Sequence, residues 1–448
     1  MPNQSACRLL GVLFLLALPL VAVQTADAAP AIVAAAEAAD IDSQAWSEAE
    51  KSNTVQAYQA YLDAFPGGAY VGLAKVRIAA MRAAADSGSG PLKTVKIGHV
   101  SPLTGQFKGL GKDNENGARL AVEELNTQRI VIGGARIRFE LVTKDDAGDP
   151  EKALSAAHEL VAEGVVGVVG HLNTGTTVPA SKVYYEAGIP QISPTAITPL
   201  LTRQGYGTVF SLPTDAEALP SVVARYVAET YRPTKVVVVA DGTVYGLGTA
   251  KAFDRIASNS GQNVVDRVSV DPKWGEFNQP ANRIFAYEPD VVYIGISDAS
   301  TAAALINAFH ASGFDPYIVG TDSICTDNMG KMVDNASKIV CGIAEGKLAM
   351  RTVALDKFKQ KYHDRYGADK QVDYSPFTYD AVNILVDAMR RADSTEPSRY
   401  LPALKETAYT GVMTEYQFGP NGDNLYRAVT IYGYQNKVKV GRSTLEAR

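Results

Sequence analysis

Most of the chain after residue 94 alternates between short apolar runs and longer segments with apolar residues at helical spacing. The apolar runs are rich in valine and isoleucine, which is typical of strands buried on both faces of a parallel sheet. The expected strands read VKIGHV, IRFELVT, GVVGVVG, IPQIS, KVVVVA, NVVDRVSV, DVVYIGI and PYIVGTD. The expected helices between them read NENGARLAVEELNT, PEKALSAAHELVAEG, TVPASKVYYEAG, YGLGTAKAFDRIASNSG, FNQPANRIFAYEP and STAAALINAFHASG.

This succession predicts an α/β fold with doubly wound parallel sheets. The series is interrupted by the irregular segment RQGYGTVFSLPTDAEALP and restarts at Lys235. We therefore expect two lobes, each with its own sheet. In open α/β sheets, ligands bind beyond the carboxyl ends of the strands.

Residues 29–84 follow another pattern, which predicts a short helical hairpin. Two runs of apolar residues at helical spacing flank the sequence FPGG, a helix stop. The pair resembles one tetratricopeptide-type repeat, and both a helical spacer and a protein-binding surface over residues 41–84 remain open. The alanine-rich AAPAIVAAAEAAD before it is expected to be a loosely ordered leader, and residues 85–93, ADSGSGPLK, a linker.

Residues 1–28 predict a secretory signal peptide. Arg8 lies in a short polar segment, an apolar core spans Leu9–Val23, and Ala26-Asp27-Ala28 fits a small-x-small cleavage site. The apolar core is too short to span a membrane, and Cys7 precedes it, whereas a lipoprotein needs a cysteine just after the core. We expect a soluble periplasmic protein.

Charge and motifs argue against several classes of function. The formal net charge of the 448-residue chain is −5, and no basic run occurs, so neither nucleic acid nor an anionic membrane is an expected partner. The chain has no GxGxxG, Walker or GxSxG motif at the required place, and its five histidines stand apart. We predict no cofactor, no metal site and no catalytic residue.

The cysteine count predicts one bridge. Cleavage after residue 28 would leave only Cys325 and Cys341. Two cysteines in an oxidising compartment most simply form one disulfide, although two buried free thiols remain open. Neither cysteine lies in a CxxC motif.

Small polar residues gather where expected strands end. The stretch VVGHLNTGTTVPAS runs from an apolar strand into a helix and places Thr174 and its neighbours at the helix start. Hydroxyl and free N–H groups there attract a carboxylate. ISPTAITP ends another strand with Thr195, and GTDS ends a strand of the second lobe with Asp322, a partner for a ligand ammonium. Each of these residues can also be a simple cap or turn-former.

From Thr94 to about Gly441 the chain resembles the leucine/isoleucine/valine-binding protein family, the extracytoplasmic receptors of ABC importers. The resemblance rests on GHVSPLTGQFKGLGKDNENGARLAVEELN, DDAGDPEKA, GVVGHLNTGTTVPASKVYYEAGIPQISPTAITPLLTRQGY, ADGTVYGLG, DVVYIGI and FTYDAVNIL, in the family's order. It implies a type I periplasmic-binding fold, with two lobes joined by three crossings that close on the ligand. The implied lobes are residues 94–214 with 343–425, and residues 215–342 with 426–448.

The resemblance also implies roles for single residues. Thr174 corresponds to the residue that binds the ligand carboxylate, with Asn173 beside it. Asp322 corresponds to the acidic residue that receives the ammonium, and Tyr245 to an aromatic that covers the ligand on closure. The full predicted ligand-binding set is Leu110, Asn173, Thr174, Thr195, Ala196, Ile197, Tyr245, Ser297 and Asp322.

Several positions depart from the family pattern. Ile197 replaces a threonine that helps to hold the amino group, Leu110 stands where an aromatic often walls the pocket, and Ser297 where a tyrosine can stand. Gly148 and Asn173 occupy the positions of a disulfide present in some members. Retention of Thr174 and Asp322 favours an α-amino acid, while a carboxylate or amide without an amino group becomes the rival ligand.

The favoured function is a soluble receptor that binds an amino acid or a related small carboxylate or amide and passes it to the ABC permease subunits in the membrane. A receptor of this kind encloses its ligand between two mobile lobes. The alternative is a periplasmic sensor that signals to a partner through the N-terminal hairpin. An extracytoplasmic enzyme is the least favoured reading, because no nucleophile–base pair is evident.

Overall fold

The computed structural model describes residues 29–86, 91–213, 217–345 and 348–446. The expected signal peptide lies outside the described residues. The chain forms two compact units, one of residues 1–53 with 57–76 and one of residues 54–56 with 77–448. We describe each by itself.

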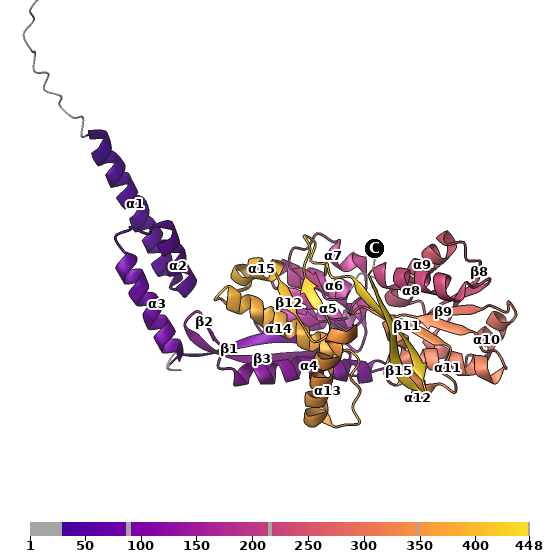
Figure 1. Ribbon diagram of the computed structural model, residues 1–448. Coiled ribbons are helices and arrows are strands. Elements are labelled where there is room, and N and C mark those ends of the chain that lie inside the picture. The colour runs from indigo at the N-terminus through magenta and orange to yellow at the C-terminus, as the bar shows by residue number, and fades with distance from the viewer. Residues whose placement is uncertain (1–28, 87–90, 214–216, 346–347, 447–448) are drawn as a thin grey trace, which may run out of the picture. The chain divides into compact units, whose positions relative to one another are not determined.

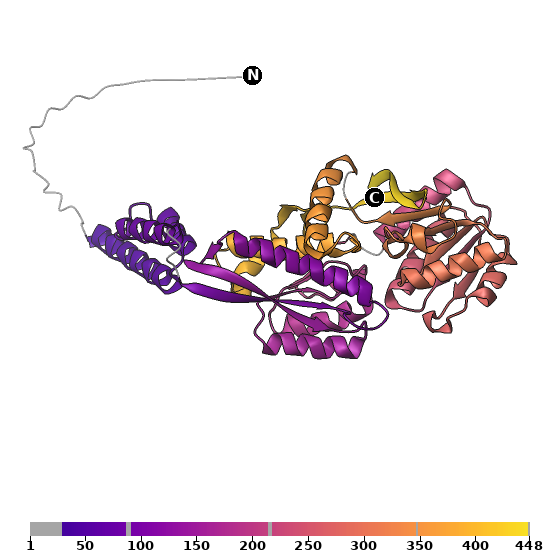
Figure 2. The ribbon, with the colours of Figure 1, turned by 90° about the horizontal axis from the view of Figure 1, so that it is seen from below.

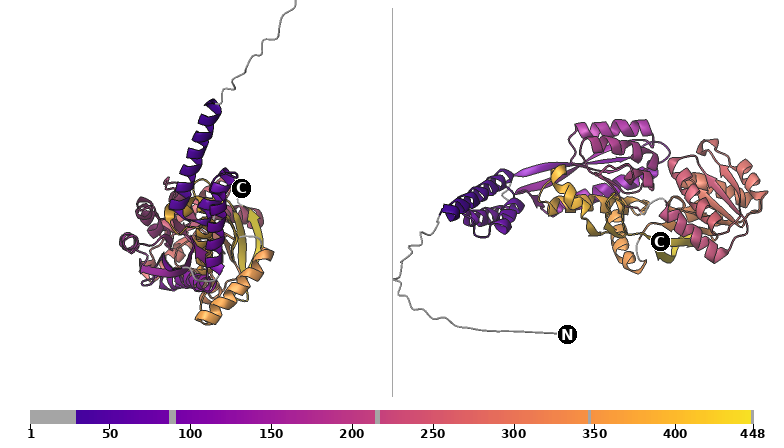
Figure 3. Two further views of the ribbon diagram at one scale, coloured as in Figure 1. Left: turned by 90° about the vertical axis from the view of Figure 1, so that its left-hand side faces the viewer. Right: turned by 90° about the horizontal axis from the view of Figure 1, so that it is seen from above.

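The N-terminal unit is helical. It contains α1 (Ala29–Ser52), α2 (Val55–Ala64) and the first part of α3 (Val71–Asp86), which lie side by side in Figure 3. The ring of Trp46 packs against Tyr58, Tyr61 and Tyr70 with centroid distances of 5.1–5.4 Å. The two predicted helices are present. The expectation of a loosely ordered leader was wrong, because the alanine-rich stretch forms the start of α1, as the high helix propensity of alanine favours.

The larger unit contains two sheets, and the first comes mainly from the N-terminal half of the chain (Figure 1). Its order is β2-β3-β1-β4-β5-β6, with only the β2–β3 pair antiparallel. These strands are β1 (Leu92–Ser101), β2 (Val131–Ile132), β3 (Ala135–Asp145), β4 (Gly167–Gly170), β5 (Gln191–Ser193) and β6 (Val209–Ser211). This sheet and the helices around it form the first lobe. The helices are α4 (Lys108–Thr127), α5 (Pro150–Ala162), α6 (Thr174–Glu186), α7 (Pro199–Thr202), α13 (Leu348–Tyr366), α14 (Ser375–Arg391) and α15 (Pro397–Lys405).

The second sheet defines the second lobe and has the order β15-β14-β11-β10-β9-β7-β8. Its first three strands pair antiparallel and the others pair parallel. The strands are β7 (Val236–Ala240), β8 (Val264–Ser269), β9 (Val291–Gly295), β10 (Tyr317–Gly320), β11 (Ile339–Ile343), β14 (Ala428–Gln435) and β15 (Val438–Glu446). The helices are α8 (Ala218–Tyr231), α9 (Val244–Asn259), α10 (Asn278–Phe285), α11 (Ala299–Ala311) and α12 (Met329–Met332). A separate ribbon pairs β12 (Ala408–Thr410) with β13 (Glu415–Gln417).

The chain passes between the sheets three times: after β6, after β11 and before β14. As a result α14, late in the sequence, packs against α4 and buries Ala381, Val382 and Leu385 in the first lobe's core. Figure 2 shows the long helix α4 lying along the first sheet, and the C-terminal strands lying with the second. The predicted α/β class and the two sheets are confirmed. The residue boundaries of the lobes stay a prediction.

The expected disulfide is present and links the second lobe internally. Cys325, just after the 3₁₀ turn Asp322–Ile324, is bonded to Cys341 in β11, and both side chains are buried. The bridge therefore ties the loop that carries Asp322 to the neighbouring strand. In the part of the chain that the structure describes, no helix is both long and apolar enough to cross a bilayer.

Candidate ligand-binding site

A cavity of about 320 Å³ lies where the carboxyl ends of strands from both sheets meet. The loops after β1, β3, β4 and β5 supply the wall on the first lobe, and the loops after β7, β9 and β10 the wall on the second. Tyr374, just before α14, completes it. The volume falls within the range of about 300–1,000 Å³ that small-molecule sites occupy.

Seven of the nine predicted residues line this cavity: Leu110, Asn173, Thr174, Thr195, Tyr245, Ser297 and Asp322. Ala196 does not; it is buried against Leu201 and Val209. Ile197 also lies outside, in the apolar cluster around α8, and faces a separate cavity of about 30 Å³ behind Asp322. The structure thus brings the six predicted polar residues together with Leu110 and sets Ala196 and Ile197 behind them.

The first lobe presents the start of α6 to the cavity. Asn173 precedes the helix and supplies no side-chain cap, while the N–H groups of Thr176 and Thr177 both donate to its carbonyl oxygen. The N–H groups of Thr174 and Gly175 belong to the first turn, which has no intrahelical acceptor for them, and both residues line the cavity. We call this segment, Asn173–Gly175, the donor end, because its free N–H groups and the helix dipole favour an anion.

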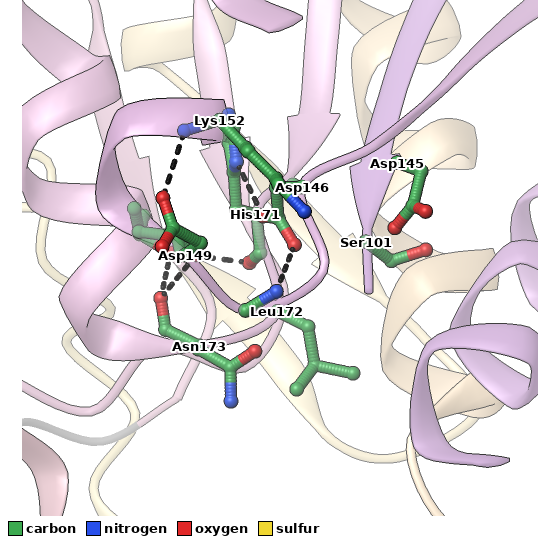
Figure 4. A network of polar contacts seen from close by, with 12 residues as sticks. Ser101, Asp145, Asp146, Asp149, Lys152, His171, Leu172 and Asn173 are labelled. Atoms are coloured by element: carbon green, nitrogen blue, oxygen red, sulfur yellow. Dashed lines mark hydrogen bonds and ion pairs between the residues drawn. The ribbon is translucent and has the colours of Figure 1, made fainter. Parts of the chain in front are cut away.

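A buried network holds the donor end in place (Figure 4). His171 Nδ1 lies 2.8 Å from Asp146 Oδ2, His171 Nε2 lies 3.0 Å from the Tyr184 hydroxyl, and all three side chains are buried. The other oxygen of Asp146 accepts the N–H of Gly148 at 2.9 Å. Asp146 therefore joins the loop after β3 to the loop after β4. Among the described residues no group of three or more His, Cys, Asp or Glu could hold a metal.

The second lobe presents Asp322, whose two oxygens are each held by a tyrosine. The Tyr245 hydroxyl donates to Oδ1 and the Tyr374 hydroxyl to Oδ2, both at 2.9 Å. Burial raises the pKa of the Asp322 carboxyl, and the two phenol hydrogen bonds counteract that rise. Burial, followed by the charge of Asp322, raises the pKa of both phenols, so they remain protonated donors. We call Tyr245, Ser297 and Asp322 the acceptor end.

Asp241, which directly follows β7, fixes Ser297, which lies in the loop after the neighbouring strand β9. One oxygen of Asp241 accepts the hydroxyl and N–H of Ser297 at 2.5 and 2.7 Å, and the other accepts the hydroxyl and N–H of Thr243 at 2.6 and 3.0 Å. A side chain at Gly246 would place its Cβ 2.1 Å from the same carboxylate, so only glycine fits there. The Ser297 hydroxyl therefore donates its proton to Asp241 and can only accept a hydrogen bond from a ligand.

Apolar side chains separate the two ends. Ten of the seventeen lining residues were not in the predicted set, and two of these, Phe107 and Tyr374, have large side chains. Phe107 lies one turn before Leu110, and a Cβ at Gly148 would come within 2.9 Å of its ring, so Gly148 makes room for it. Gly148 was the sequence feature that could have pointed to a large side chain packed at this place. Tyr374 was missed because no local pattern connects it with Asp322, which is 52 residues away. The remaining apolar lining is Pro150, Leu172 and Val244.

Comparisons with known proteins agree with this architecture. The Leu/Ile/Val-binding protein BraC3 of Rhizobium johnstonii is 28% identical over 358 residues, covering 76% of this chain and 92% of the relative. The substrate-binding protein LivJ of Streptococcus pneumoniae, solved in complex with isoleucine, superposes with a TM-score of 0.70 at 23% identity, covering 79% of this chain and 99% of that one. A solute-binding protein of an ABC transporter from Rhodopseudomonas palustris, in complex with 3,4-dihydroxybenzoic acid, gives 0.70 at 18% identity, covering 79% and 98%.

The structural likenesses confirm the type I periplasmic-binding fold, and the sequence likeness confirms the resemblance to Leu/Ile/Val-binding proteins. The family model described as "Periplasmic binding protein" matches residues 94–439, which leaves the N-terminal helices outside the match. This match covers most of the chain. The chain therefore belongs to the periplasmic binding protein family, whose members are solute receptors and not enzymes.

Proposed function

We propose that the protein is an extracytoplasmic receptor of an ABC importer that binds a neutral α-amino acid with an apolar side chain. The observation that carries this proposal is the opposite chemistry of the two ends of the cavity. The donor end offers N–H groups and the Thr174 hydroxyl to a carboxylate, and the acceptor end offers the Asp322 carboxylate to an ammonium. A zwitterion satisfies both ends at once.

The cavity also limits the ligand's side chain. Apart from Asp322 no charged residue of the described chain lines it, and Phe107, Leu110, Pro150, Leu172 and Val244 supply apolar surface. A ligand with a charged side chain would leave that charge without a partner, at a cost of several kcal/mol. A branched-chain or similarly apolar side chain fits, in keeping with the printed names of the relatives.

The rival ligand is a small carboxylate or amide without an amino group. The solved receptor with 3,4-dihydroxybenzoic acid shows that this fold can hold an aromatic acid. Such a ligand would satisfy the donor end alone and leave the partly buried Asp322 carboxylate facing it without a cation. We therefore favour the α-amino acid.

Delivery to an ABC permease and a periplasmic location belong to the same proposal. The predicted signal peptide and the function named for the relatives support both. The alternative of a sensor rests on α1–α3, which the family match does not include. A partner role for residues 41–84 stays a prediction.

A thermal-shift screen of the mature protein tests the ligand class. The panel contains the twenty amino acids, benzoate, 3,4-dihydroxybenzoate, simple amides and urea, because a ligand that binds only the folded state raises Tm. We expect the largest shifts with leucine, isoleucine or valine, and smaller or no shifts with lysine and aspartate. A shift from an aromatic acid or amide with none from any amino acid would replace the proposed ligand with the rival class.

A further inference from the structure

The geometry points to Asp113 as a positioning residue for the acceptor end, acting through Tyr374. Asp113 lies on α4 of the first lobe, is 4% exposed and does not line the cavity. Its Oδ2 accepts three consecutive backbone N–H groups, those of Asp373, Tyr374 and Ser375, at 3.1, 2.6 and 3.0 Å. A side chain about 260 positions earlier thus caps the start of α14.

The start of α14 depends on this external cap. Tyr374 precedes the helix with no side-chain cap of its own. The N–H groups at a helix start need acceptors, and a carboxylate there is also favoured by the helix dipole. Hydrogen bonds to a charged acceptor are roughly twice as strong as neutral ones. Asp113 therefore fixes the backbone of Tyr374 more firmly than a neutral side chain could.

Close packing of α4 on α14 sets where that backbone lies. A Cβ at Gly117, one turn after Asp113, would come 2.2 Å from the carbonyl oxygen of Ser375. Glycine at this position lets the two segments approach, and the approach places Asp113 within reach of the three N–H groups. The relative position of α4 and Tyr374 is thus determined by contacts on both sides of the cap.

Tyr374 transmits this position to the ligand site. Its hydroxyl donates to Asp322 Oδ2 at 2.9 Å, across from the first lobe to the second, and its side chain lines the cavity. The Tyr245 hydroxyl holds the other oxygen of Asp322. If the backbone of Tyr374 shifts, one of the two bonds that orient the Asp322 carboxylate is lost. Asp113 thereby acts on the ammonium site without touching it.

Asp380 provides a matched control on α14 itself. Its buried carboxylate also accepts two backbone N–H groups, those of Val412 and Met413 at 2.8 and 3.1 Å, and the Tyr416 hydroxyl at 3.0 Å. It does not line the cavity. Asp380→Asn should therefore lower stability without changing the ligand site.

The test compares the wild type, Asp113→Asn, Tyr374→Phe and the double variant of the mature protein by titration calorimetry with L-leucine. Asparagine keeps the shape of Asp113 and one acceptor oxygen, so the fold should persist. Asparagine removes the charge that strengthens the three hydrogen bonds to Oδ2. We therefore expect each single change to weaken leucine binding about tenfold, and the double variant to bind no more weakly than the poorer single variant, because both changes weaken the same restraint. Asp380→Asn should stay within about twofold of the wild type.

Two outcomes would overturn the inference. One is an Asp113→Asn variant within about twofold of the wild type in leucine affinity. The other is a double variant whose loss equals the product of the two single losses, which would make Asp113 and Tyr374 independent. A loss of leucine binding in Asp380→Asn as large as that in Asp113→Asn would likewise show a general structural effect.

The leucine measurement rests on the proposed function, and a second measurement does not. If the wild type binds no leucine, the proposed ligand class fails, and urea unfolding decides the inference. It compares the same four proteins together with Asp380→Asn and the Asp380→Asn/Tyr374→Phe double variant. Tyr374→Phe should raise the equilibrium constant of unfolding by some factor in the wild type. In the Asp113→Asn background that factor should be smaller by at least about threefold. Equal changes in both backgrounds would overturn the positioning role, and the Asp380→Asn background should give the full wild-type change.

Discussion

The two ends of the cavity use different chemical groups of the protein. The donor end consists of backbone N–H groups and a hydroxyl at the start of α6, positioned by the buried Asp146–His171–Tyr184 contacts. The acceptor end, Tyr245, Ser297 and Asp322, has one charged group, the Asp322 carboxylate, which is oriented by the hydroxyls of Tyr245 and Tyr374. A helix start recognises a carboxylate on many ligands, whereas the partly buried Asp322 carboxylate favours a ligand that carries a cation. The acceptor end should therefore decide which ligands are accepted.

The largest expected effect follows from removing the charge of the acceptor end. Asp322→Asn should weaken leucine binding by about 2–5 kcal/mol, roughly 30-fold or more, because the ammonium loses its charged partner. Titration calorimetry measures the loss. Asp290→Asn, in which an exposed carboxylate accepting the N–H groups of Thr234 and Lys235 is neutralised, serves as the control and should leave affinity unchanged. Equal affinity in Asp322→Asn and the wild type would mean that the acceptor end does not bind a cation.

Removing the disulfide, which ties the loop of Asp322 to β11, should lower the stability of the protein. Replacing Cys325 and Cys341 by serine opens a loop closed across a sequence separation of 16, and the chain-entropy estimate for such a loop is about 3 kcal/mol of stability. Urea unfolding of the variant, compared with the oxidised and the reduced wild type, measures this. Reduced wild type and variant should coincide. A variant within about 1 kcal/mol of the oxidised wild type would contradict the expectation.

At the donor end the effect should be smaller, because several groups share the carboxylate. Thr174→Val should cost about 1.5–3 kcal/mol of leucine binding, the range for a hydrogen bond to a charged group. Thr176→Val is the matched control: it lies on the same helix, its hydroxyl donates to the Asn173 carbonyl at 3.0 Å, and it does not line the cavity. If both variants lose affinity equally, Thr174 acts only through the helix start.

The pH dependence of binding should separate the two ends. Burial raises the pKa of Asp322, so on lowering the pH this carboxylate takes up a proton earlier than an ordinary aspartate. The neutral acid cannot pair with an ammonium, which stays charged throughout. Leucine affinity should therefore fall as pH decreases, by up to about tenfold per unit below that pKa, and Asp322→Asn should show a flat profile. A wild-type profile as flat as that of the variant would contradict this.

The smallest effect on binding is expected at Ile197. This side chain is 4% exposed and packs in the apolar cluster with Leu219 and Val222, behind Asp322. Ile197→Thr should keep leucine affinity within about threefold and lower the free energy of unfolding by about 1–3 kcal/mol, since it buries a hydroxyl among apolar groups. A tenfold weakening of leucine binding at unchanged stability would show instead that Ile197 takes part in the ligand site.

The sequence was sufficient for eight strands of the two sheets and for the polar residues at strand ends, since both depend on local patterns. It did not predict β2, β6, β11, β14 and β15, nor that β2, β14 and β15 pair antiparallel. Buried valine runs predicted β7 and β9, and the hydroxyl-rich stretch after β4 predicted the start of α6. The pairing of Cys325 with Cys341 followed from their number. Ala196 and Ile197 were placed in the site by resemblance, and their side chains turn into the apolar core behind it.

Contacts between residues far apart in the sequence could not be predicted from it. The cap on α14 joins Asp113 to residues 373–375, and the Tyr374–Asp322 bond joins two lobes. Both depend on how α14 returns to the first lobe after the second crossing, which no periodicity encodes. The helical leader was missed for another reason: its alanines have high helix propensity but no amphipathic pattern, so hydrophobic periodicity gave no signal.

The central claim is that the ligand must satisfy both ends of the cavity, and a series of three compounds tests it most directly. Calorimetry on the wild type compares L-leucine with 4-methylpentanoate, which lacks the amino group, and with 3-methylbutylamine, which lacks the carboxylate. The account predicts that leucine binds at least about 100-fold more tightly than either. If 4-methylpentanoate binds as tightly as leucine, the acceptor end plays no part in recognition and the claim is wrong.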